Sequence, residues 1–410
     1  MDGARLLADL DHLASIGADP AGGVSRVAYS AADIEARGWV RETMLALGME
    51  VRRDEAVNLM GRYPGREGHL KPLALGSHTD TVPNGGRFDG ALGVVGALAC
   101  VRALHDAGVR LRHPVEVIDF AAEEATLGGG TVGSLAMMGR LPAGVLNRTA
   151  WDGRPAAAHL RDAGLDPRGL NRAVRPRRCL AGYLELHIEQ GATLDAAGVP
   201  IGVVEGIVGI RRCAVTFAGL ANHAGTTAMA DRRDALVMAA PFVTGLRDVV
   251  VAAGIVGTVG VLRVQPGASN VIPGRVELEA EIRGLDEAVL DRVEAELTGL
   301  AERLGGELKR TSVKAPTRSH PTLVGALETA CGALGLAWRR MPSGAGHDAM
   351  VIGESIPQAM AFVPSRGGVS HSPEEFTPPE RCVDGARVLL RALLELDDLL
   401  DSREAAPDRL

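Results

Sequence analysis

Short apolar runs alternate with longer stretches of helical periodicity along the first part of the chain. Leucines recur at helical spacing over residues 6–13, and Ser30 is placed to cap a second helix that follows it. Apolar runs at 72–76 and 115–120 predict buried strands, and the apolar pattern at 91–107 predicts a helix between them. This order is typical of an α/β fold with a mostly parallel sheet.

A second pattern, in the order βαββαβ, occupies the middle of the chain. It consists of strands expected at 211–217, 257–264, 275–283 and 307–313 and helices expected at 234–253 and 286–304. That order fits a ferredoxin-like module of roughly 110 residues. The α/β pattern then resumes with a helix at 322–334 and a strand at 359–363. We therefore expect an α/β domain formed by 1–206 and 320–410, with a mixed, mostly parallel sheet flanked by helices, and an inserted α+β domain at 207–319.

Composition narrows the class of protein. The formal net charge of −7 argues against a generic nucleic-acid binder, and 46% hydrophobic with 23% charged residues is ordinary for a globular chain. The five cysteines form no CxxC pair, as expected of buried thiols in a reducing compartment. The start of the chain does not have the pattern of a signal peptide, and charges interrupt the apolar stretches before they reach the ~18–20 residues of a membrane span. We expect a soluble cytoplasmic protein with no nucleic-acid or membrane partner.

Polar residues gather where the predicted strands end, which is where ligands bind in open α/β sheets. The candidates are His78, Asp80, Asp89, Glu123, Glu124, His187, Glu189 and His371. Histidine and carboxylate without cysteine is the ligand set of a catalytic site for Zn²⁺, Mn²⁺ or a similar ion. Three histidines and two carboxylates exceed what one catalytic zinc uses, so we expect two ions that share a bridging carboxylate.

Two positions suggest more specific roles. Asp80, two residues after His78, suits a partner that orients the imidazole. The neighbours Glu123 and Glu124 can divide the work, because one can ligate metal while the other polarises the attacking water. A single histidine is more often structural, and a Glu-Glu pair is usually a solvated helix face. The joint placement of the candidates after separate strands is what favours a site.

A rival motif lies at 128–133, where the chain matches GxGxxG, with Asp152 at about the distance of a ribose-binding acid. In a dinucleotide site the first glycine directly follows the strand, whereas seven residues separate Phe120 from Gly128 here. We therefore interpret the match as coincidence in a chain with 52 glycines. A dinucleotide-binding protein and a metal-stabilised protein without catalysis stay as alternatives, and chelation separates them from a metal-dependent enzyme.

Longer motifs carry a resemblance to a known family. They are Gly76-Ser-His-Thr-Asp-Thr-Val, Gly85-Gly-Arg-Phe-Asp-Gly, Phe120-Ala-Ala-Glu-Glu, Leu186-His-Ile-Glu-Gln-Gly, Asn222-His-Ala-Gly-Thr-Thr, Ser269-Asn-Val-Ile-Pro-Gly, Ser343-Gly-Ala-Gly-His-Asp and Ser370-His371. With them, residues 23–376 resemble the metal-dependent amidohydrolases that include N-carbamoyl-L-amino-acid hydrolase, allantoate amidohydrolase and β-ureidopropionase. These enzymes are related to the di-zinc carboxypeptidases and aminoacylases.

The resemblance implies an activity and a metal pair. The implied reaction is hydrolysis of the carbamoyl (ureido) C–N bond of a small N-carbamoyl amino acid or related ureido acid, with release of ammonia and CO₂. Allantoate hydrolysis, or cleavage of an N-acyl amino acid or dipeptide on the same metal centre, is the alternative. Two divalent ions are implied, Zn²⁺ as the first choice and Mn²⁺, Co²⁺ or Ni²⁺ as others. Their ligands would be His78, Asp89, Glu124, His187 and His371, with Asp89 as the bridge.

The remaining roles also come from the resemblance. Glu123 would be the general base and acid, with Asp80 and His223 as further catalytic residues. The substrate would contact Gln190, His223, Asn270, Arg283 and Gly344. Asn270 and Arg283 would hold the carboxylate of an anionic substrate. The domain at 207–319 would be a lid that also forms a homodimer, so that His223 completes the site of the partner subunit.

Three segments depart from the family pattern, at 54–58, 125–128 and 226–229, and the second of them adjoins the glutamate pair. Ala125-Thr-Leu-Gly128 stands where the family usually has a glycine or proline followed by an Arg-Phe pair. This segment directly follows the Glu123-Glu124 pair. The resemblance therefore does not determine which side chain the substrate carries.

Overall fold

In a computed structural model, which describes residues 1–404, the chain divides into two compact units. The first comprises Met1–Gly206 with the described residues from Ser319 onward, and the second comprises Ile207–Arg318. Each unit has a hydrophobic core of its own.

The first unit is built on a mixed sheet. Its strands are β1 (Glu50–Arg53), β2 (Leu59–Tyr63), β3 (Leu73–His78), β4 (Val115–Phe120), β5 (Gly182–Ile188), β6 (Ile201–Ile207), β12 (Trp338–Ser343) and β13 (Gln358–Val363). They lie in the order β1-β2-β4-β3-β5-β13-β6, with β12 beside β6. The four central strands, β4, β3, β5 and β13, are parallel to one another, and the pairs on either side of them are antiparallel. The expected mixed α/β sheet with a parallel centre is therefore confirmed.

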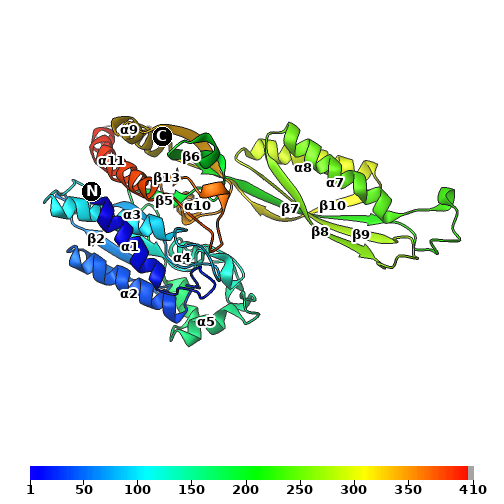
Figure 1. The fold of residues 1–410 in the computed structure, drawn as a ribbon, viewed down its shortest axis with the longest axis horizontal. Helices are drawn as coiled ribbons and strands as arrows, with labels where there is room; N and C mark the ends of the chain where they lie inside the picture. Colours follow the sequence, from blue (N-terminus) through cyan, green and yellow to red (C-terminus); the bar gives the residue numbers. More distant parts are fainter. Residues whose placement is uncertain (405–410) are drawn as a thin grey trace. The chain divides into compact units, whose positions relative to one another are not determined.

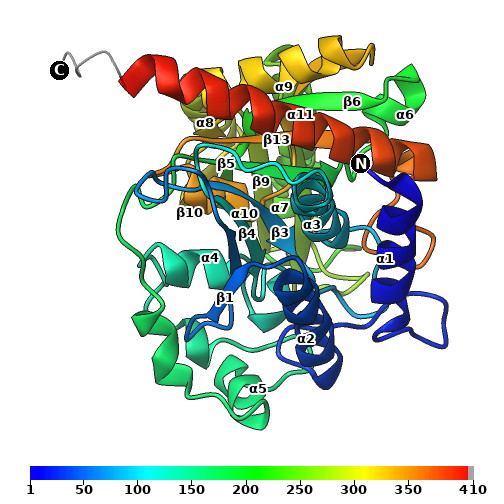
Figure 2. The same ribbon diagram turned by 90° about the vertical axis from the view of Figure 1, so that its left-hand side faces the viewer.

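Helices cover this sheet (Figures 1 and 2). They are α1 (Gly3–Ser15), α2 (Ala31–Ala46), α3 (Ala91–Asp106), α4 (Val132–Met137), α5 (Ala156–Asp162), α6 (Thr193–Ala197), α9 (Pro321–Ala333), α10 (Asp348–Ile352) and α11 (Pro379–Glu404). Apolar side chains of α1, α2, α3, α9 and α11 form the main core with the strands. Helix α2 begins where the sequence predicts, because the Ser30 hydroxyl accepts the Asp33 N–H at 3.2 Å and caps its first turn.

The second unit is an antiparallel sheet with two helices, α7 and α8, packed against it (Figure 1). Its elements are β7 (Gly209–Ala218), α7 (Ala235–Ala252), β8 (Val256–Gln265), β9 (Arg275–Gly284), α8 (Glu287–Arg303) and β10 (Gly306–Lys314), followed by the short strand β11 (Thr317–Arg318). The strand order β10-β7-β9-β8 is that of a ferredoxin-like module. Phe217, Phe242 and Leu278 are among the buried side chains that join the helices to the sheet.

Helix α7 has 18 residues with a mean hydropathy of 1.7, and it passes a length and composition test for a membrane span. Arg247 and Asp248 interrupt its apolar residues, as expected of such stretches in this chain. The same helix buries Ala239, Phe242 and Leu246 in the core of the second unit. One such helix is weak evidence for a span, because a core helix of a soluble protein has the same composition.

Candidate metal centre

Most of the candidate residues lie at one edge of the sheet of the first unit, at or after the carboxyl ends of its central strands. His78 ends β3, and Glu123 and Glu124 follow the end of β4. His187 lies one residue before the end of β5, and His371 lies in the loop after β13. Because these strands are parallel neighbours, their carboxyl ends meet at the same edge of the sheet. The sheet therefore brings together side chains that are far apart in the sequence.

Asp89 lies at the centre of these side chains. Its Oδ1 is 3.1 Å from Nε2 of His187 and 3.8 Å from Nε2 of His78. Its Oδ2 is 3.1 Å from Nε2 of His371, and Oε1 of Glu124 is 3.4 Å from the same nitrogen. The potential ligand atoms thus form two groups, each spanning no more than 4.8 Å, and both groups contain Asp89.

The orientation of the imidazoles fits metal binding. Nδ1 of His78 is 3.0 Å from the main-chain oxygen of Asp80, and Nδ1 of His187 is 2.9 Å from that of Ile188. A carbonyl oxygen only accepts hydrogen bonds, so each Nδ1 carries the hydrogen and each Nε2 is left as a ligand. Imidazole and carboxylate donors in two groups that share one carboxylate fit a pair of divalent ions.

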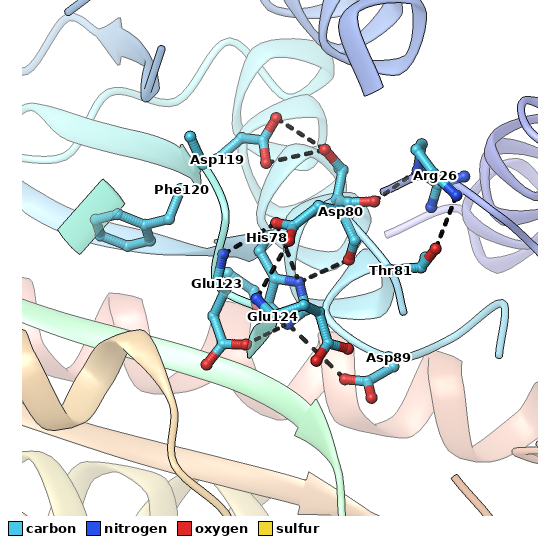
Figure 3. Close-up of polar contacts among 12 residues, drawn as sticks. Arg26, His78, Asp80, Thr81, Asp89, Asp119, Phe120, Glu123 and Glu124 are labelled. Atoms are coloured by element: carbon cyan, nitrogen blue, oxygen red, sulfur yellow. Dashed lines mark hydrogen bonds and ion pairs between the residues drawn. The ribbon is translucent and has the colours of Figure 1, made fainter. Parts of the chain in front are cut away.

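The Asp80 side chain acts on the glutamates rather than on the imidazole. Its Oδ1 is 3.7 Å from Nδ1 of His78, beyond hydrogen-bond distance, and the main-chain oxygen of Asp80 holds that ring instead. The two carboxylate oxygens accept the N–H groups of Glu123 and Glu124, each at 3.2 Å (Figure 3). Asp80 therefore fixes the main chain at the Glu123-Glu124 pair.

A buried arginine supports this arrangement from α2. Arg37 lies 2.9 Å from Asp33, 3.0 Å from Asp119 and 3.9 Å from Asp80, and all four side chains are buried. It also donates to the main-chain oxygens of Asp119 and Phe120 at the end of β4. The Arg37 guanidinium thus links α2 to the end of β4, directly before the segment that carries Glu123 and Glu124.

Burial and mutual repulsion perturb the carboxyl groups of the site. Burial raises the pKa of Glu123 well above its ordinary value, and the nearby Asp348 and Glu124 carboxyls raise it further. Burial, followed by repulsion from Asp89, raises the pKa of Glu124 to about 8. Perturbed carboxyl groups of this kind are typical of functional sites.

The pKa values of the histidines around Asp89 depend on burial and on their contacts with that carboxylate. Burial lowers the pKa of His78 to about 4. Burial also acts to lower the pKa of His187, but its hydrogen bond to Asp89 and the charges of Asp89 and Glu185 together outweigh this and raise the pKa to about 9. The hydrogen bond to Asp89 likewise raises the pKa of His371 to about 9. Asp89 is the group that attracts positive charge to this site.

Two of the expected substrate-binding residues lie in the first unit. Gln190 is in contact with the candidate ligands, since its Nε2 donates to Oδ2 of Asp89 at 2.7 Å. Gly344 is exposed and lies between β12 and α10.

The other three lie in the second unit and do not share one place. The loop of His223 meets that of Asn270, because the Ala224 N–H donates to the Asn270 main-chain oxygen at 2.9 Å. Arg283 lies at the opposite end of β9, where its Nε contacts Glu281 at 2.6 Å. At ~3.3 Å per residue, the stretch from Arg275 to Arg283 alone spans about 26 Å. The expectation that Asn270 and Arg283 hold the same carboxylate is therefore wrong for a single copy of the chain.

Two buried residues near the site were not singled out from the sequence. The ring of His347 lies 4.5 Å from that of His187, and its Nε2 is 2.9 Å from the Ser343 hydroxyl. Glu185 accepts hydrogen bonds from Ser77 and Tyr183 and forms a third group of potential ligands with His187 and His347. His347 could have been recognised from the sequence, because it belongs to the motif that begins at Ser343.

The glycines of the GxGxxG match have a packing explanation. A Cβ at Gly130 would lie 2.5 Å from the main-chain oxygen of Glu123, and one at Gly133 would lie 2.4 Å from that of Ala121. They therefore let the chain pass closely behind the glutamate pair. Asp152 contacts His159 at 3.1 Å.

Comparisons with known proteins match most of this chain. The model of peptidase family M20/M25/M40 matches residues 74–395. An N-carbamoyl-L-amino acid amidohydrolase of Geobacillus stearothermophilus is 39% identical over 97% of this chain and 99% of its own length. An allantoate amidohydrolase of Escherichia coli K12 is 34% identical over 94% and 96%. The crystal structure of a hydantoinase/carbamoylase family amidase from Burkholderia multivorans superposes with a TM-score of 0.87, at 36% identity over 96% of this chain and 97% of that one.

Proposed function

Because this chain belongs to peptidase family M20/M25/M40, we propose that it is a metal-dependent amidohydrolase of ureido acids. It hydrolyses the carbamoyl C–N bond of a small N-carbamoyl amino acid or related ureido acid, with release of ammonia and CO₂. The observation that carries the proposal is the meeting of two groups of ligands at Asp89, beside the buried Glu123. The names of the relatives, N-carbamoyl-L-amino acid amidohydrolase and allantoate amidohydrolase, support the ureido group as the target.

The ligand groups suit two divalent ions, for which we propose Zn²⁺ first and Mn²⁺, Co²⁺ or Ni²⁺ as alternatives. His78 and His187 would hold one ion and Glu124 and His371 the other, with Asp89 shared between them. When bound, such ions supply positive charge that lowers the pKa of water and polarises a carbonyl oxygen. The negative net charge of the whole chain therefore does not oppose an anionic substrate at this site.

Glu123 is the proposed general base and acid. Its carboxyl group lies 3.8 Å from Nε2 of His78, and its main-chain N–H donates a hydrogen bond to Asp80. As a carboxylate it accepts a proton from the attacking water, and it later returns that proton to the leaving nitrogen. For the Gln190 amide, which donates to Asp89, we propose that it orients the polar end of the substrate.

We also propose that the enzyme is a cytoplasmic homodimer in which the second unit, as a lid, contributes residues to the partner's site. The support comes from β9, since Asn270 lies in the loop before this strand and Arg283 near its other end, so that the two can serve one substrate only from two copies. Arg283 would come from one subunit, and Asn270 with His223 from the other. An arginine is suited to gripping a carboxylate through two parallel hydrogen bonds.

Mixing two inactive variants tests this sharing. Subunits that carry Glu123→Gln and His223→Ala should recover about a quarter of the wild-type activity after random exchange, because half of the dimers contain one intact site of two. If both residues of a site come from the same chain, mixing restores nothing.

A substrate panel tests the activity itself. Ammonia release is measured with N-carbamoyl-L-amino acids, N-carbamoyl-β-alanine and allantoate, and amine release with N-acetyl amino acids and dipeptides, each with Zn²⁺, Mn²⁺, Co²⁺ and Ni²⁺. We expect ammonia from at least one ureido acid at a kcat/KM well above that for the acyl compounds. Turnover of acyl compounds alone would instead assign an aminoacylase or peptidase.

A further inference from the structure

Glu375 lies in the loop between β13 and α11, four residues after His371, and its side chain is buried. Its Oε1 accepts the main-chain N–H groups of Phe88 at 2.9 Å and Asp89 at 3.1 Å. Its Oε2 accepts the hydroxyl of Ser370 at 2.8 Å. One carboxylate therefore joins the loop that carries Asp89 to the loop that carries His371.

Gly86 shows that the Asp89 loop is shaped around this carboxylate. A Cβ added to Gly86 would lie 2.0 Å from Cδ and Oε1 of Glu375. Gly86 does not have a left-handed φ, so the backbone conformation does not require a glycine at this position. The need for glycine comes from the close approach of the Glu375 carboxylate.

The two ligand groups differ in what holds them. His78 lies in β3 opposite Phe120 of β4, and His187 lies in β5 opposite Phe362 of β13, so the pairing of the strands fixes their positions. His371 lies in a loop with a left-handed φ of 53°, and its side chain is 48% exposed. The group of Asp89, Glu124 and His371 therefore depends on contacts between loops for its geometry.

We propose that Glu375 is a positioning residue that sets the affinity of the Asp89–Glu124–His371 group for its metal ion. It holds the main chain of Asp89 directly and reaches the neighbour of His371 through Ser370. The inference rests on the metal pair of the proposed function, and it assigns a specific part of that centre to a residue that is not itself a ligand.

The hydrogen bonds of the Ser370 hydroxyl indicate how the conservative variant Glu375→Gln should behave. Its Oγ lies 2.8 Å from Oε2 of Glu375 and 3.2 Å from Oδ2 of Asp89, but it has one hydrogen to donate. In Glu375→Gln, the side-chain oxygen can still accept both main-chain N–H groups and the side-chain NH₂ can donate to Oγ. The hydroxyl hydrogen is then free to point at Asp89, so the glutamine variant keeps the link between the loops. Glu375→Ala removes all of these hydrogen bonds and with them the link between the two loops.

Zinc release provides the test. Each purified full-length protein is loaded with Zn²⁺, counted by elemental analysis, and mixed with a chromogenic chelator whose absorbance reports each ion as it leaves. For Glu375→Ala we expect one of the two ions to bind ~10–100-fold more weakly, the size typical of lost outer contacts at metal sites. Gly86→Ala, which displaces the same carboxylate from the other loop, should show the same loss if Glu375→Ala does not fold. Glu375→Gln should stay close to wild type.

Glu374→Ala is the matched control, because Glu374 is the exposed neighbour of Glu375. It should release both ions as wild type does, and the activity of Glu375→Ala should return as free Zn²⁺ is raised. Release of both ions from Glu375→Ala at wild-type rates, equal weakening of both ions, or a glutamine variant as impaired as alanine would each overturn the proposal. If the wild-type protein itself does not bind two ions, the proposed metal pair is wrong rather than the role of Glu375 alone.

Discussion

Replacing Glu123 by glutamine removes one proton-carrying group and changes little else. Glutamine has the same length, and the main-chain N–H at residue 123 still donates to Asp80. The five proposed ligands are untouched. Because burial favours the neutral form of Glu123 in the metal-free protein, the neutral amide costs no stability there. We therefore expect folding and metal content to be unchanged.

The expected loss is catalytic. A positioned general base or acid contributes ~10²–10⁴ in rate. That factor corresponds to about 2.7–5.5 kcal/mol of activation free energy. Glu123 would serve both proton transfers, so the upper half of this range is expected in kcat, with KM nearly constant.

Ammonia release gives kcat and KM, and elemental analysis of the same samples gives the metal content. Glu124→Gln is the matched comparison, since it changes the neighbouring residue in the same way. It should lose metal from the His371 group, whereas Glu123→Gln should not. If Glu123→Gln keeps its ions and turns over within about tenfold of wild type, the assignment of Glu123 as general base is refuted.

Three further predictions follow from the packing and the charges. Gly90→Ala would place a methyl group 2.4 Å from the His78 ring at a left-handed φ of 63°, so zinc occupancy and the melting temperature should both fall; unchanged occupancy would contradict the geometry. Arg37→Met should cost ~3–5 kcal/mol in urea unfolding, because it leaves buried carboxylates without their cation, and a loss below 1 kcal/mol would refute this. The metal-free protein should lose stability as pH rises from 6.5 to 9. The pKa values of His187 and His371 are raised to about 9 in the fold, so their contribution is complete below pH 6.5 and disappears as pH passes about 9. Melting in chelator across this range checks the sign, and a rising melting temperature would contradict it.

Elements with strong local patterns could be predicted from the sequence. The strand β4 and the helix α3 lie where mostly apolar stretches predict them, and Gly108 follows the end of α3. The strands β1 and β12 were not predicted, because their side chains are mostly exposed and show no alternation. Their pairing partners, rather than their own residues, make them strands.

The site was predictable to the extent that its residues end strands. His78 follows an apolar run, and His187 lies near the end of a strand whose apolar residues alternate with polar ones. Parallel strands bring such ends together. Glu375 does not end a strand, and two of its three partners are main-chain N–H groups more than 280 residues away, so its role could not be predicted from the sequence. The separation of Asn270 and Arg283 could have been inferred, since the predicted strand at 275–283 already lies between them.

Zinc titration of chelator-stripped protein tests whether hydrolysis requires a pair of ions. Ammonia release from the best ureido acid is followed while bound Zn²⁺ per chain is measured in the same sample. We expect no release from the stripped protein and full activity when two ions are bound per chain. Ureido hydrolysis by the stripped protein, or saturation of activity at one ion per chain, would contradict a centre built on two groups that share Asp89.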